Sequence, residues 1–192
     1  LRKKYGTEPI VSSYITDPWL IDGKKSHFRM YLLIRAPGTS ISGKSVPYLY
    51  QLWNQGKAFT GLLPFQMKDF DNANIHDTHV RSTDRDRFFN LTDSSIDDTG
   101  LTLDQRNIIF SQMQEIVTYI GQIMSNKSEP YRGSHNAYDI FGLDFMIRRN
   151  TMSIVLLEVN TNMAMKSIDS SHLPGYNPHT GPWTPRYTQF SH

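Results

Sequence analysis

The stretch Asp139–Thr161, which reads DIFGLDFMIRRNTMSIVLLEVNT, decides the fold of this chain of 192 residues. Two runs rich in β-branched and aromatic residues, 138–147 and 153–160, flank a polar segment at 148–150. Runs of this kind with a short polar segment between them predict two antiparallel strands joined by a turn. We therefore expect a hairpin whose turn is centred on residues 150–152.

The predicted hairpin carries acidic residues on one face. Asp144 lies opposite Glu158, and Gly142 lies opposite Asn160, on the same face. Two carboxylates directly opposite each other repel, so this pairing is unfavourable unless a positive charge lies between them. Mg²⁺ or Mn²⁺ would supply that charge, because hard cations take carboxylate and amide oxygens as ligands. The alternative is an exposed polar sheet face with scattered acids. The other face is expected to be wholly apolar and to consist of Phe141, Leu143, Phe145, Val155, Leu157 and Val159.

A second predicted strand runs from Lys25 to Ile34, where polar and apolar residues alternate. Lys25, His27 and Arg29 share one face, and a row of cations on a rigid strand suits phosphate oxygens. A solvated basic face is the alternative. Together with the acidic hairpin, the strand indicates a nucleotide-phosphate site. Its apolar face consists of Phe28, Met30, Leu32 and Ile34.

The middle of the chain is predicted to be a second hairpin followed by a loop. Residues 46–52 and 57–63 read as paired strands, with Asn54-Gln55-Gly56 as their connection. Residues 68–99 show little periodicity and read as a long polar loop. Within it, His76 and His79 have no other apparent ligands nearby, so we interpret them as solvated rather than metal-binding.

The strongest helix signal begins at Thr102, which forms a capping box with Gln105 three residues later. Isoleucine, valine and methionine then recur at spacings of three and four up to Met124, as in a helix with one buried face. These elements predict an α+β fold, in which one long helix packs on a mainly antiparallel sheet. Residues 166–192, rich in Pro, Gly, Ser and His, are expected to form an irregular tail.

Composition excludes several classes of protein. An aromatic content of 12% supplies apolar surface for a core, and no apolar run approaches the roughly 20 residues of a membrane span. A net charge of +2, from 20 basic and 18 acidic residues, gives no argument for nucleic acid or a membrane surface as a partner. The lack of cysteine excludes a disulfide scaffold, a cysteine-ligated zinc site and a thiol nucleophile.

Three segments, in this order, resemble the tubulin–tyrosine ligase-like branch of the ATP-grasp ligases. Residues 11–23 resemble the hinge of that family and the "PLLIDGRK" run after it, and residues 25–29 resemble its "KFDIR" strand. Residues 139–161 resemble "DIFGFDFLID…WLLEVNTSPSL", which is the most specific of the three. Thr78-His79 resembles the start of the family's "THLTN" segment. The resemblance spans most of residues 10–165.

The resemblance implies an ATP-grasp-like fold that is incomplete. Residues 1–165 would form the C-terminal portion of the ligase domain. In the family, a lobe with phosphate-gripping lysines precedes the hinge, and this chain starts at Leu1, almost at the hinge. The N-terminal lobe would then come from upstream in the native protein or from a partner chain.

Site residues follow from the same resemblance. Asp144, Glu158 and Asn160 would hold Mg²⁺ or Mn²⁺ against the ATP phosphates. Arg29 would be the catalytic residue, facing the transferred phosphoryl group or an acyl phosphate. The nucleotide would be bound by Ser13, Tyr14, Ile15, Lys25, His27, Arg29 and Asn160.

The implied reaction activates a carboxylate as an acyl phosphate, which an amine then attacks to give an amide. Its donor would be an amino acid of the tyrosine, glutamate or glycine type. Its acceptor would be a protein with an acidic tail, with tubulin as the candidate. The resemblance places such an enzyme in the cytoplasm, in association with microtubules or cilia. No covalent nucleophile of the enzyme is needed, which agrees with the lack of cysteine.

Departures from the family pattern support two further readings. His27 stands where the family has aspartate. Gln51 stands where the family usually has an arginine that contacts the incoming substrate, and Phe59 stands at a second arginine position. The first alternative is a catalytically inactive ligase-like domain that serves as a structural or interaction module. The second is an ATP-grasp ligase that acts on a small molecule.

Overall fold

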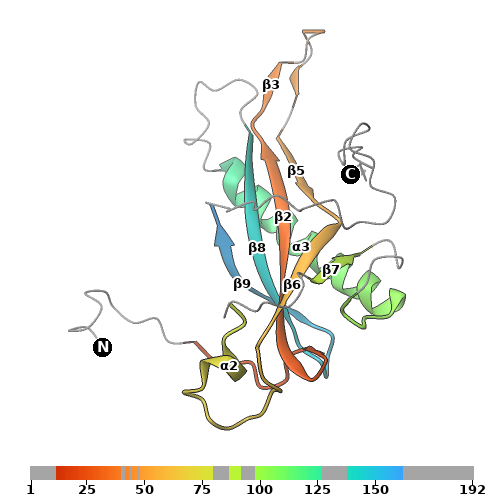
Figure 1. Ribbon diagram of the computed structural model, residues 1–192. Helices are drawn as coiled ribbons and strands as arrows, with labels where there is room; N and C mark the ends of the chain where they lie inside the picture. Colours follow the sequence, from red (N-terminus) through yellow and green to blue (C-terminus); the bar gives the residue numbers. More distant parts are fainter. Residues whose placement is uncertain are drawn as a thin grey trace, which may run out of the picture. The chain divides into compact units, whose positions relative to one another are not determined.

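The computed structural model describes residues 12–39, 42–43, 45–46, 48–79, 87–91, 98–126 and 138–161, all of which belong to the unit Leu1–Asn162. These residues form an α+β fold with a main antiparallel sheet, a separate two-stranded sheet and one long helix, and the mainly antiparallel α+β class is as predicted (Figure 1). The predicted tail 166–192 lies outside the described residues. The predicted boundary at residue 165 lies outside them too and stays a prediction.

Along the described residues, six strands are followed by a short helix, a strand, a long helix and a final pair of strands. Their bounds are β1 Leu20–Ile21, β2 Lys24–Arg35, β3 Gly38–Thr39, β4 Ser45–Val46, β5 Leu49–Leu52, β6 Gln55–Thr60, α2 Ala73–His76, β7 Arg87–Asn90, α3 Leu103–Asn126, β8 Tyr138–Ile147 and β9 Ile154–Asn160.

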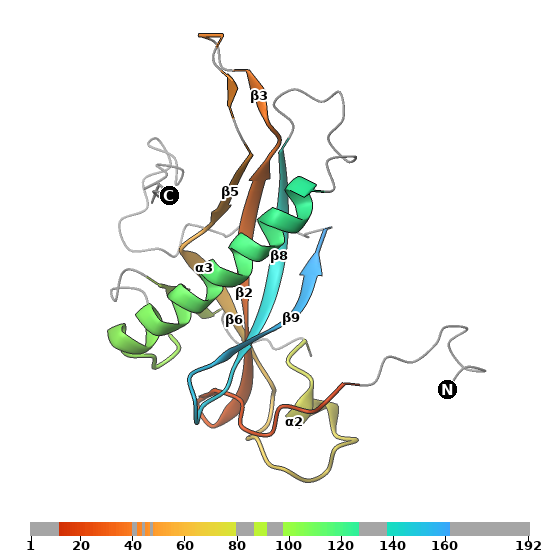
Figure 2. The same ribbon diagram turned by 180° about the vertical axis from the view of Figure 1, so that it is seen from behind.

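Strand β2 is the centre of the main sheet. The strand order is β7-β6-β2-β8-β9, with β1 and β5 also paired to β2, and every pairing is antiparallel. Helix α3 lies across one face of this sheet, in front of it in Figure 2 and behind it in Figure 1. The sheet therefore has one face covered by α3 and an opposite face that carries the polar side chains of β2 and β8.

The core lies between α3 and the sheet, and the predicted alternation of β2 is confirmed. Phe28, Met30, Leu32 and Ile34 of β2 are fully buried, together with Ile109, Met113 and Val117 of α3. Burying each side chain of this size contributes about 1.5–3 kcal/mol to folding. The predicted start of α3 is also confirmed: the Thr102 backbone N–H donates to Gln105 Oε1 (2.9 Å), and the Gln105 N–H donates to Thr102 Oγ1 (3.3 Å).

The second predicted hairpin is wrong, because the chain does not reverse at Asn54-Gln55-Gly56. Strands β5 and β6 both pair with β2, β5 along Leu32–Arg35 and β6 along Ser26–Arg29. The Trp53 N–H donates to the Tyr31 carbonyl oxygen (2.8 Å), so the chain follows β2 between the two strands. Gly56, which suggested a turn, lies inside β6, where a glycine allows another part of the chain to approach closely.

The loop predicted over residues 68–99 is wrong in part. It contains α2, a helix of four residues capped by the Asn72 side chain, and β7, a strand of four residues that pairs with β6. Elements of this length show too few periods for a hydrophobic pattern to reveal them. Residues 80–86 and 92–97 of the predicted loop lie outside the described residues.

The register predicted for β8 and β9 is confirmed. Gly142 pairs with Asn160, and Asp144 pairs with Glu158. A β-bulge follows between Asp144 and Phe145, so the polar face of the hairpin ends where the regular pairing is interrupted.

The apolar face predicted for β9 is wrong, because the bulge adds one residue to this strand. Phe145 pairs with Leu156 and Ile147 pairs with Ile154, and these β9 residues pack against the core in place of Val155. Leu157 and Val159 are 45% and 41% exposed. An alternating pattern cannot reveal the position of an inserted residue, and the error follows from that.

No helix in the described part of the chain is both long and apolar enough to cross a membrane.

We predict that Gly56→Ala destabilises the fold by about 1–3 kcal/mol or more, because it overpacks a full core. An added Cβ would lie 2.5 Å from the Met30 sulfur, 2.6 Å from the Arg29 carbonyl oxygen and 2.8 Å from the Phe89 ring. Urea unfolding followed by circular dichroism measures the change. Gln55→Ala, at the exposed preceding residue, is the control and should change the stability by less than about 0.5 kcal/mol. Equal stability of the two variants would contradict the packing described for β6.

Candidate functional site

The polar face of β2, β8 and β9 gathers most of the side chains that the sequence singles out. Arg29 of β2 pairs across the sheet with Asp144 of β8, and Asp144 pairs with Glu158 of β9. Because side chains alternate along a strand, these three residues point away from α3. The register of three strands therefore forms this site, and no loop is needed to bring these side chains together.

Arg29 and Asp144 form a bidentate ion pair. Arg29 Nε donates to Asp144 Oδ1 at 2.7 Å, and Nη2 donates to Oδ2 at 2.6 Å. The Asp144 side chain is 1% exposed and that of Arg29 is 24% exposed. Burial alone would raise the pKa of Asp144, but the hydrogen bonds and the charge of Arg29 outweigh it and hold that pKa below its ordinary value. The hydrogen bond from Arg29 to Asp144 likewise raises the pKa of Arg29.

Asn160 joins the two carboxylates. Its Nδ2 atom donates to Glu158 Oε1 at 3.0 Å and to Asp144 Oδ2 at 3.3 Å. The two carboxylates predicted from the sequence, those of Asp144 and Glu158, therefore both lie within hydrogen-bonding distance of the Asn160 amide. The positive charge that opposed carboxylates require is supplied by Arg29 in this structure.

Lys25 lies in a separate cluster with Tyr14 and His76. Lys25 Nζ donates to the Tyr14 hydroxyl (3.3 Å) and to the His76 carbonyl oxygen (3.0 Å). The Tyr14 hydroxyl is also 2.7 Å from His76 Nδ1. Burial lowers the pKa of Lys25, and the nearby Asp77 opposes that shift. The ammonium group is therefore held by α2 and by the segment before β1, apart from the ion pair of Arg29.

The other two residues predicted at the hinge have different environments. Ser13 is exposed, whereas Ile15 is 8% exposed and belongs to the buried apolar residues. Tyr14 is 39% exposed and lies edge-to-face against Phe70, with ring centroids 5.7 Å apart. An aromatic and apolar surface next to a lysine is suited to a flat heterocycle.

His27 is fully buried between the two clusters. Its Nδ1 atom lies 2.6 Å from Thr78 Oγ1, and its ring stacks on those of Phe59 and His79, with centroids 4.8 and 4.6 Å away. Burial lowers the pKa of His27 to about 4, because the opposing effect of Asp144 is smaller and the cations around it add to the lowering. Its Nε2 atom is buried without a hydrogen-bond partner. The imidazole is thus neutral at pH 7, so His27 adds no charge of its own to the row of cations predicted on this strand.

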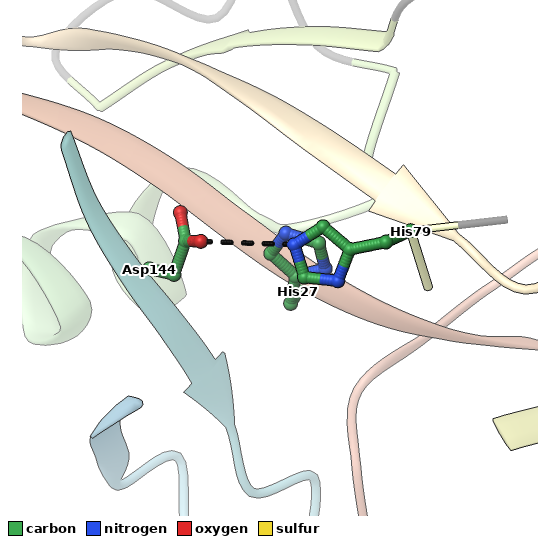
Figure 3. A group of neighbouring side chains, drawn as sticks. All are labelled: His27, His79 and Asp144. Atoms are coloured by element: carbon green, nitrogen blue, oxygen red, sulfur yellow. Dashed lines mark ion pairs between the residues drawn. The ribbon is translucent and has the colours of Figure 1, made fainter. Parts of the chain in front are cut away.

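His79 was not assigned to the site from the sequence, and its exposed side chain agrees with the interpretation as a solvated residue. Its side chain is 57% exposed, but its ring lies on His27, and its Nε2 atom is 3.9 Å from Asp144 Oδ2. Figure 3 shows the ring of His27 behind that of His79, with both facing the carboxylate of Asp144. Thr78-His79 resembled a family segment, and this was the one signal in the sequence that could have marked the residue.

The site contains the donor types that a hard cation takes. Two carboxylates and the carbonyl oxygen of an amide are ligands that suit Mg²⁺. Asp144 would have to share its oxygens with Arg29, whereas Glu158 is exposed and accepts a hydrogen bond from the Asn160 amide. The residues therefore fit a magnesium ion that is held mainly at the open, Glu158 side of the cluster.

No protein-family model matches the chain, and no curated protein matches it either.

We predict that Arg29→Met destabilises the fold by about 2–4 kcal/mol at pH 7, because it leaves Asp144 buried and charged without its partner. In the parent, the lowered pKa of Asp144 contributes stability above about pH 4, which is lost as the pH falls through the folded-state pKa. In the variant, burial is no longer opposed by Arg29, so the pKa of Asp144 rises and protonation removes the unpaired charge. The difference in stability between parent and variant should therefore shrink from pH 7 to pH 4, as measured by urea unfolding at each pH.

Arg148→Met is the matched control. It breaks the ion pair between Arg148 Nη1 and Asp17 Oδ1, which lie 3.0 Å apart. The Arg148 side chain is 37% exposed and that of Asp17 is 16% exposed, so the loss of folding stability should be about 1 kcal/mol or less. If the difference in stability between the parent and Arg29→Met does not change with pH, the charge of Asp144 is not the cause of the destabilisation.

Proposed function

We propose that this chain supplies one half of the active site of an ATP- and Mg²⁺-dependent carboxylate–amine ligase of the ATP-grasp type. One observation carries the proposal. Asp144, Glu158 and Asn160 lie within hydrogen-bonding distance of one another on the sheet face opposite α3, with Arg29 bound to the first of them. A phosphoryl-transfer site requires this combination of metal-binding oxygens and a rigidly held cation.

The proposed site uses few residues. Asp144, Glu158 and the Asn160 carbonyl oxygen would hold Mg²⁺, which when bound offsets phosphate charge. Arg29 would place its guanidinium beside the transferred phosphoryl group, where it is held by Asp144 and loses little freedom on binding. Tyr14 and Lys25 would contact the adenosine part of ATP.

The substrates in this proposal come from the resemblance. An amino acid would be joined to a protein acceptor with an acidic tail, for which tubulin is the candidate, in the cytoplasm near microtubules or cilia. The second, lysine-bearing lobe would come from elsewhere in the native protein or from a partner chain. No part of the proposed site calls for nucleic acid.

Magnesium-dependent ATP binding by the native protein tests the proposal. We expect Glu158→Gln to weaken the binding of ATP in the presence of Mg²⁺ about tenfold or more, because it removes a charged metal ligand. Isothermal titration calorimetry with and without Mg²⁺ measures the effect. Glu115→Gln makes the same chemical change on the exposed side of α3 and should leave binding unaltered. If Glu158→Gln binds and turns over ATP like the parent, the assigned role is wrong.

A catalytically inactive module is the second candidate, and the ion pair itself favours it. Both oxygens of Asp144 are already bound by Arg29, so the buried carboxylate is neutralised without a metal. The face would then act as a structural element, and the protein as a scaffold for a partner. Incubation of the native protein with ATP, single amino acids and an acidic peptide, followed by mass spectrometry, separates the two candidates. A peptide that gains the mass of one amino-acid residue would exclude the inactive module.

A further inference from the structure

Two histidines that have no part in the proposed reaction lie beside Asp144, the carboxylate of the ion pair. One ligand atom from each of His27, His79 and Asp144 can be chosen so that all three lie within 4.8 Å of one another. His27 comes from β2, Asp144 from β8, and His79 from the segment that follows α2. Within the described residues, no other group of three potential ligands lies this close.

The unpartnered nitrogen of His27 points to a ligand. His27 is fully buried, its Nδ1 atom is bound by Thr78 Oγ1, and its Nε2 atom has no hydrogen-bond partner. A buried polar atom without a partner is costly, and native proteins satisfy nearly all of them. A metal ion at Nε2 would satisfy it, provided that Nδ1 carries the proton and donates it to Thr78. This arrangement, in which a second residue fixes the tautomer of a ligating histidine, is usual around bound metals.

Asp144 has room for one further contact. Of the hydrogen bonds from Arg29 and Asn160, one reaches Oδ1 and two reach Oδ2. A carboxylate offers about four acceptor sites, two on each oxygen, so the remaining site is on Oδ1. His79 Nε2 already lies 3.9 Å from Oδ2 (Figure 3). Ligand atoms of a tetrahedral zinc site lie about 3.4 Å apart, so a moderate inward movement is needed. His79 can make that movement, because its side chain is 57% exposed and lies outside the strands.

We propose that His27, His79 and Asp144 form a binding site for Zn²⁺ or a chemically similar transition-metal dication. The imidazole ligands decide the class of metal, because Mg²⁺ prefers oxygen ligands and zinc takes histidine nitrogen readily. Three protein ligands leave a fourth position for water or an anionic group, as in zinc sites that are open to substrate. The proposal goes beyond the ligase proposal: the two share Asp144, but zinc binding requires neither ATP nor Glu158.

Metal titration of the full chain without nucleotide tests the proposal. We expect one tight equivalent of Co²⁺ with the intense visible absorption of a four-coordinate ion, and Zn²⁺ should displace it. His79→Ala should lower the affinity for the tightly bound Co²⁺ at least about tenfold, because a direct ligand is lost. The residue is exposed, so the variant should fold. Thr78→Val keeps the shape of the side chain and should weaken binding by about tenfold, because it frees the His27 ring.

His76→Gln is the matched control, because it removes a neighbouring histidine at the end of α2 and keeps a hydrogen-bonding side chain. This variant should bind one equivalent of Co²⁺ as tightly as the parent does. That result would distinguish binding at the proposed site from weak binding by the other histidines of the chain. The proposal fails if Co²⁺ gives only the weak spectrum of a six-coordinate ion, or if His79→Ala and His76→Gln bind Zn²⁺ equally. Neither result would bear on Mg²⁺–ATP binding, which is measured separately through Glu158.

Discussion

The pairing of β2 with β8 is the constraint on which the rest of the structure depends. Residues 28–35 of β2 pair with residues 138–145 of β8, and every other strand of the main sheet attaches to one of these two except β7, which pairs with β6. Alternation along this pair assigns Phe28, Met30 and Leu143 to the core under α3 and assigns Arg29 and Asp144 to the opposite face. A slip of one residue would bury Arg29 in the core, so the packing of the core and the geometry of the site are set by the same register.

Burial makes the ion pair a requirement of the fold as well as a feature of the site. A carboxylate that is 1% exposed is costly to keep charged unless a partner compensates for lost hydration. Arg29 does this with two hydrogen bonds, and the stacking of His27 on Phe59 closes the same region against water. Substitutions at this pair therefore affect stability and binding together, and only matched controls separate the two effects.

Much of this arrangement follows from the sequence, and the parts that do not have identifiable reasons. The strict alternation of β2 and the facing positions of Asp144 and Glu158 could be predicted, because side-chain period and turn position determine them. The bulge after Asp144 could not, since an inserted residue leaves no mark in an apolar run. The approach of His79 to His27 could not either, because it joins residues 52 positions apart through a short helix without periodicity. Gly56 was misread for a related reason: a glycine in a turn and a glycine under a neighbouring side chain look the same in a sequence.

Charge distinguishes the two metals proposed for this face. Asp144, Glu158 and Arg29 together carry one net negative charge, so a magnesium ion bound there alone would leave the cluster positive. Phosphate groups would restore the balance, and Mg²⁺ is therefore expected to bind together with ATP rather than before it. The histidine site has only Asp144 to offset the dication, and Arg29 already neutralises that carboxylate. Charge attraction is weak at that position, so the affinity must come from bonds to neutral imidazole nitrogen, which zinc forms and magnesium does not.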